Sequence, residues 1–208
     1  LSLDPTIIIG ENDMGPPAVL EQINRTGVEV AIVPEDHSVL GVKAKVKCIA
    51  GIVNKKIEAQ RLFEEKLDPA IDKLEIASQK VSEKNTKAIF ILGLQSGSPL
   101  IGGMDTSANG LIEMIGAKNV LSSFEGWKPV STESILMAEP DVILISNRGL
   151  NAFGDVESLR QHPALALTPA AKNNNIIAMD GMAMLGFGPR TIFSALNIAN
   201  DILDINDQ

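Results

Sequence analysis

The residues best suited to contact a ligand gather near the carboxyl end of the chain, at positions 179–190. This segment reads M-D-G-M-A-M-L-G-F-G-P-R and lies between an apolar strand pattern and a helix pattern. Methionine is flexible and polarisable, so such a cluster packs well around a large flat apolar ligand, although core filling explains it equally well. Arg190 either captures an anionic ligand group or pairs with a nearby carboxylate at the start of its helix.

Side chains for catalysis or metal binding are scarce. The two histidines, His37 and His162, fall in turn or helix-end contexts, and we expect both to be exposed. The sequence has no His-x-x-x-His motif and no Cys/His cluster, which argues against a transition-metal site. The Gly-x-Gly at Gly186 lacks a third glycine, and Pro189 removes a backbone donor, so it is a weak phosphate cradle. We therefore expect a protein that is not an enzyme.

Composition narrows the class of protein further. The chain has 208 residues and a net charge of -8, and an acidic chain repels the phosphate backbone of nucleic acids. No apolar run approaches the roughly 20 residues that span a bilayer. The single cysteine, Cys48, excludes an intrachain disulfide, and its apolar helical context favours buried packing. The absence of tyrosine and the low aromatic content of 3% disfavour carbohydrate or base stacking.

Apolar runs alternate with helical patterns, which predicts an α/β fold built on parallel sheets. In the first part of the chain, strands at 7–9 and 28–33 alternate with helices at 16–26 and 38–53. The same order recurs later, with strands at 142–145 and 175–179, a loop and helix between them, and a final helix at 190–203. In front of this repeat we expect a strand at 88–92, a helix at 107–115 and a short helix from 131. Strands and helices in series imply right-handed crossovers.

The two parts are unequal in length, because the second has an additional strand and helices in front of its repeat and the first has nothing. If both are lobes of one design, the native protein extends upstream of Leu1. We predict three regions: residues 1–53 as the remainder of an N-terminal α/β lobe, 54–85 as a connecting helix and 86–208 as the C-terminal α/β lobe.

The connecting region 54–85 is charged, free of glycine and rich in helix formers, with apolar residues at near-helical spacing. We expect a long solvated helix that forms a stiff hinge, with a kink or break near Asp68 because Pro69 falls inside it. Ligands of hinged α/β proteins bind between the lobes, at the carboxyl ends of the strands. The segment 179–190 would then lie at the ligand-facing edge.

A second polar segment runs from Trp127 to Glu133. Ser131 can cap a helix, and Glu133 lies in the first turn, where negative charge is stabilised. Capping is a sufficient account of these residues, although an exposed glutamate here could also pair with a basic partner.

Taken together, these segments resemble the periplasmic haem-binding (haemin-binding) proteins of bacterial ABC importers, in the class that also includes vitamin B12 and ferric-siderophore binders. The resemblance runs along nearly all of the chain. The matching stretches are residues 1–5, 15–20, 115–120, 128–133 and 185–190. The Gly-Pro-Pro-x-Val-Leu and Leu-Gly-x-Gly-Pro-Arg stretches favour haem over the sister ligands.

The resemblance implies two Rossmann-like lobes with parallel sheets joined by a long helix, the class III architecture, with an incomplete N-terminal lobe. Haem would be the transported ligand in the cleft, with no catalytic cofactor, and the location would be periplasmic. Glu133 would dock onto arginines of the membrane permease. The residues predicted to bind the ligand are Arg190, Met182, Met184, Phe187 and Trp127.

The sequence departs from the family pattern in two places. The family's axial tyrosine is expected upstream of Leu1, so this chain supplies no metal ligand, and the loop at 122–126 lacks the histidine of some relatives. The incomplete lobe could lead to a homodimer or to segment exchange. The alternatives are a ferric-siderophore or cobalamin binder of the same class, a signalling or adhesion domain, and a small doubly wound enzyme.

Overall fold

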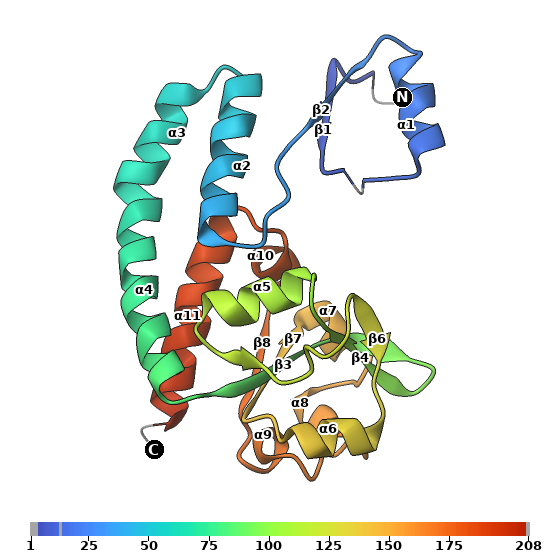
Figure 1. Ribbon diagram of the computed structural model, residues 1–208, viewed down its shortest axis with the longest axis vertical. Coiled ribbons are helices and arrows are strands. Elements are labelled where there is room, and N and C mark those ends of the chain that lie inside the picture. The colour runs from blue at the N-terminus through green and yellow to red at the C-terminus, as the bar shows by residue number, and fades with distance from the viewer. Residues whose placement is uncertain (1–3, 13, 207–208) are drawn as a thin grey trace.

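The computed structural model describes residues 4–12 and 14–206, and it contains two separate sheets. A two-stranded sheet and one helix form a small N-terminal unit, which stands beside the top of a helical hairpin, apart from the large sheet (Figure 1). The mixed α/β architecture expected from the sequence is confirmed. Of the stretch 1–5 that contributed to the family resemblance, residues 1–3 lie outside the described residues.

The N-terminal unit is a single β-α-β motif. Strand β1 (Ile7–Gly10) pairs in parallel with β2 (Glu29–Ile32), and α1 (Pro17–Asn24) connects them. Proline at the first helical position fits α1 because its missing N–H would have had no helical partner there. Gly27, with a φ of 81°, reverses the chain after the helix. The strands and the helix thus lie where the apolar runs predict them.

The next region is a helical hairpin. Helix α2 (Val39–Ile52) begins at Ser38, whose hydroxyl accepts a hydrogen bond of 3.0 Å from the Gly41 amide. The long second arm consists of α3 (Lys56–Leu62), a π-helical turn η1 (Phe63–Leu67) and α4 (Asp68–Glu83). Pro69 cannot donate to the preceding turn, and the π-turn just before it accommodates the missing bond without ending the helix. The irregularity predicted near Asp68 is therefore a local π-turn within a continuous arm.

The long arm is packed on one side, which corrects the expectation of a solvated connecting helix. Leu67, Leu74, Ala77 and Val81 are buried in a core that they share with the last helix, α11 (Pro189–Asn206). Periodic apolar residues on a charged helix mark a stripe that must be covered, so the charge of the outer face concealed the burial of the inner one. The boundaries at 53/54 and 85/86 stay a prediction.

The large sheet has the strand order β6-β4-β3-β7-β8, with β5 (Lys118–Asn119) also paired to β3. Strands β3 (Lys87–Gln95), β7 (Val142–Ser146) and β8 (Ile176–Met179) are parallel, as predicted. Strands β4 (Ser98–Gly102) and β6 (Trp127–Pro129) are antiparallel and were not expected. The β3–β4 turn is formed by Ser96 and Gly97, both at positive φ, which is the backbone that tight hairpins favour.

Helices cover both faces of this sheet. On one face lie α4, α5 (Ser107–Met114) and α11; on the other lie α6 (Thr132–Ala138), α8 (Val156–Arg160) and α9 (Pro169–Lys172). Alternate residues of β3 serve the two cores: Phe90 faces the first and Ile91 the second, as the pleat requires. Among the helices of residues 4–12 and 14–206, none combines the length and apolar character needed to cross a membrane.

Candidate ligand-binding site

The segment 179–190 folds at the carboxyl end of β8, where the sequence placed it. It forms the short helix α10 (Gly181–Leu185) and the turn that leads into α11. The Asp180 carboxylate begins α10 by accepting a 2.8 Å hydrogen bond from the Ala183 amide. At the end of the neighbouring strand β7, Ser146 caps α7 (Asn147–Leu150) in the same way. Short capped helices thus form this edge of the sheet.

Arg190 lies in the first turn of α11 with its guanidinium exposed. Its Nη1 is 3.6 Å from Asp180 Oδ1, and both side chains are largely in water. Pairing of Arg190 with a nearby carboxylate, one of the two interpretations of this residue, is therefore present in the structure. An exposed pair at this distance contributes little, from about 0 to 1 kcal/mol, so the guanidinium is free to turn toward an anionic group.

The predicted apolar contacts divide into two groups. Met182 is 69% exposed on α10, whereas Met184 and Phe187 are fully buried in the core beneath it. Because they are buried, Met184 and Phe187 support α10 and the turn that follows it. Direct contact of either residue with a ligand stays a prediction. Arg190 and Met182 are the members of the set that this edge presents to solvent.

Trp127 is not brought to this edge. It lies on the outer strand β6, which is separated from β8 by three strands. Its half-buried ring meets Phe90 edge to face, with 6.0 Å between ring centroids, and packs against the first core. The contacts of Trp127 are those of a core residue at the rim of the sheet.

Glu133 lies on a different surface, at the start of α6. Ser131 caps this helix by accepting a 3.2 Å hydrogen bond from the Ser134 amide, and Glu133 follows in the exposed first turn. The predicted local structure is confirmed. A carboxylate at a helix start is stabilised by the helix dipole, so the position suits an exposed charge.

Lys45 and Glu11 join the N-terminal region to this edge, and neither was predicted to do so. Lys45 of α2 is almost fully buried; its ammonium forms an ion pair with Glu11, after β1, and donates a 3.3 Å hydrogen bond to the Gly186 carbonyl. One side chain therefore ties the N-terminal unit to the turn before α11. The sequence did contain a signal for this contact. Lys45 lies in register with Val42 and Ile49 on the apolar side of a predicted helix, and a buried charge requires a partner.

His37 was expected to be exposed, and the structure corrects this. Its ring lies half-buried against Phe187, with 4.9 Å between centroids. Gly110 of α5 faces the same histidine so closely that an added Cβ would stand 2.4 Å from it. The link between the N-terminal unit and α2 is thus held between α5 and the turn before α11. His162 is also half-buried, with its ring 5.3 Å from that of Phe153.

The described chain thus comprises a small and a large α/β unit, a helical arm, and exposed side chains at a carboxyl edge of the large sheet. Residues 1–183 match the family of periplasmic binding proteins, and the chain belongs to this family.

Several solved structures are similar over almost the whole chain, among them two periplasmic heme-binding proteins. The periplasmic heme-binding protein BhuT, in complex with two hemes, is 28% identical with a TM-score of 0.85, covering 99% of this chain and 77% of its own. The periplasmic heme-binding protein HutB of Vibrio cholerae is 33% identical with a TM-score of 0.80, covering 97% of this chain and 78% of its own.

Two curated relatives also match the chain. The ABC transporter substrate-binding lipoprotein YvrC of Bacillus subtilis, which is uncharacterized, is 24% identical over 97% of this chain. The ferric-anguibactin-binding protein FatB of Vibrio anguillarum is 28% identical over 71% of this chain. The chain spans 63% of the length of the first and 46% of the length of the second.

Proposed function

We propose that the protein is the substrate-binding component of an ABC importer and captures haem at the edge formed by α10 and the start of α11. The observation that carries this proposal is the similarity of nearly the whole chain to solved haem-binding proteins of the family, at TM-scores of 0.85 and 0.80. Haem is the cargo in this proposal. Neither catalysis nor a catalytic cofactor is part of it.

The exposed chemistry of this edge suits a flat apolar molecule with carboxylates. Met182 offers an adaptable apolar contact, and Arg190 can exchange its weak pair with Asp180 for a charge-assisted hydrogen bond to a propionate. In this role Met184 and Phe187 hold α10 from beneath. Trp127 lies on β6, at the opposite edge of the sheet from β8, so it is the weakest member of the proposed set.

The identity of the ligand is tested by titration. We expect both haemin and iron-free protoporphyrin to bind saturably, the first with a shift of its Soret band and the second with a change in fluorescence. The iron-free ligand makes the test independent of an axial ligand. If neither porphyrin binds and a ferric siderophore does, the siderophore alternative is correct; the similarity to FatB is the observation that favours it.

Glu133 is proposed to dock the protein onto a basic surface of the membrane permease. Its exposure at the start of α6, on a surface separate from α10, supports this role. We expect Glu133→Ala to lower uptake of haem by cells several-fold and to leave haemin affinity unchanged, whereas Glu157→Ala on α8 serves as the control. A loss of affinity would place Glu133 in the ligand site instead.

Self-association through the N-terminal unit is the remaining part of the proposal. Ile9, Val19 and Ile32 leave large apolar side chains exposed there. Apolar surface of this kind favours a homodimer or an exchange of segments. Light scattering after size exclusion is expected to show a dimer that Ile32→Lys converts to a monomer. If the parent protein is itself a monomer, self-association through the N-terminal unit is contradicted.

A further inference from the structure

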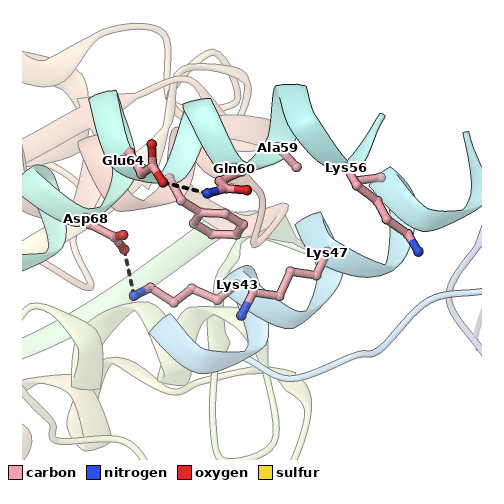
Figure 2. Close-up of a pocket in the computed structure, with 9 residues that line it drawn as sticks. Lys43, Lys47, Lys56, Ala59, Gln60, Glu64 and Asp68 are labelled. Carbon is pink, nitrogen blue, oxygen red and sulfur yellow. Dashed lines mark hydrogen bonds and ion pairs between the residues drawn. The ribbon is translucent and has the colours of Figure 1, made fainter. Parts of the chain in front are cut away.

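A cavity of about 510 Å³ lies between α2 and the α3–η1 arm, within residues 43–68. None of the residues assigned to the candidate haem site lines it. Figure 2 shows Lys43 and Lys47 of α2 on one side of the cavity and Gln60 and Glu64 of the α3–η1 arm on the other. Pockets that hold small organic molecules have volumes of roughly 300–1,000 Å³, so this one is of suitable size.

The floor of the cavity is apolar. The buried ring of Phe63 and the buried methyl group of Ala50 face it, and Ala59 completes the wall on α3. Phe63 opens the π-helical turn η1, and single π-turns of this kind are frequent at functional sites. An apolar floor of this size would bind an aromatic ring or a short aliphatic chain.

The rim of the cavity is cationic, with Lys43, Lys47 and Lys56 around it. Lys43 is paired with Asp68 at 2.8 Å. Lys47 lies over the Phe63 ring, 5.6 Å from its centroid. In the part of the chain that the structure describes, neither Lys47 nor Lys56 has a carboxylate within 4.0 Å. Two positive charges therefore stand at the rim without an ionic partner.

The segment that lines this side of the cavity is positively charged, although the whole chain is negatively charged. Residues 37–57 contain five lysines and no acidic residue, in a chain with a net charge of -8. The two carboxylates on the opposite wall are already engaged, Asp68 with Lys43 and Glu64 through a 2.8 Å hydrogen bond from Gln60. They would repel a ligand with several negative charges, so the balance favours a single anionic group.

We propose that this cavity binds an amphipathic organic monoanion. The carboxylate or sulfonate lies between Lys47 and Lys56, and the apolar part covers Phe63. The site is separate from the haem site and does not depend on the proposed function.

The probe for the test is anilinonaphthalene sulfonate, which combines an aromatic body with one sulfonate and becomes fluorescent on leaving water. We expect saturable binding at one site, weakened about tenfold or more in the double variant Lys47→Gln/Lys56→Gln because two charge-assisted contacts are lost. The control is Lys66→Gln/Lys172→Gln, which removes the same charge outside the cavity. Decanoate should displace the probe, and inorganic phosphate at equal ionic strength should not.

Other outcomes overturn the proposal. Absence of saturable binding does so, as does equal weakening in both double variants, because charge would then act at long range. Weakening by Arg190→Ala instead would place the probe in the haem site. The variant Ala59→Leu, which narrows the cavity without changing charge, must also lower affinity. Thermal unfolding of every variant must match that of the parent protein, so that binding to a loosened state is excluded.

Discussion

Strands β1 and β7 have similar sequences and very different environments. Both are continuous apolar runs, I-I-I-G and V-I-L-I-S. Every residue of β7 is buried, because the strand lies between β3 and β8 and helices cover both faces of the sheet. In β1 no residue is fully buried, since the strand pairs with β2 and with no other described strand. An apolar run thus predicts a strand but not the number of its neighbours.

The two units also differ in how firmly they are held in place. The large unit has two cores that fix α10 and α11, whereas the small unit is positioned by few contacts: the Lys45 ion pair with Glu11, the Lys45 bond to Gly186 and the packing of His37 on Phe187. The position of the small unit relative to the edge formed by α10 and α11 therefore depends on α2 and its flanking link.

The largest effect is expected from matched isoleucines in the two units. Ile143→Ala in β7 should lower the free energy of unfolding by about 2–5 kcal/mol, because it leaves a cavity in a closed core. Ile9→Ala in β1 removes the same atoms from a side chain that is 36% exposed, and should cost less than about 1 kcal/mol. Urea unfolding monitored by circular dichroism measures both. Equal losses would show that the small unit has a closed core of its own.

A smaller effect is expected at the contact between the units. Lys45→Met keeps the length of the side chain but leaves Glu11 unpaired and the Gly186 carbonyl without this donor. We expect a loss of about 1–3 kcal/mol. Amide hydrogen exchange should also become faster at residues 4–12 and in the turn at 186–188.

The control for this variant is Lys172→Met, an exposed lysine on α9. Unchanged exchange in the small unit of Lys45→Met would contradict the view that Lys45 positions it. In that case the packing of His37 on Phe187 would be the contact that matters.

Much of the fold could be predicted because it is encoded locally. Apolar runs located β1, β2, β3, β7 and β8, and Ser38 and Ser131 marked true helix starts. The antiparallel strand β4 was missed because Pro99 inside it weakens the strand signal, and β6 was missed because it has only 3 residues. The burial of the arm at 67–81 depends on α11, more than a hundred residues further on, and no local pattern specifies that partner.

The candidate site was predicted in part. The pattern placed residues 179–190 at the carboxyl end of a strand, since topology alone requires this. The pattern could not distinguish Met182, which is exposed, from Met184, which is buried. Which side of a short helix is buried depends on how the helix packs against the rest of the protein. Trp127 was grouped with them although three strands separate β6 from β8.

The most direct test of the proposed site is haemin binding by Arg190→Ala, measured beside Arg61→Ala as an exposed control on α3. If haem is held at the edge formed by α10 and α11, removing the guanidinium should weaken binding at least fivefold and alter the Soret band, and the control should match the parent protein. Unchanged affinity and spectrum in Arg190→Ala would contradict this placement of the site.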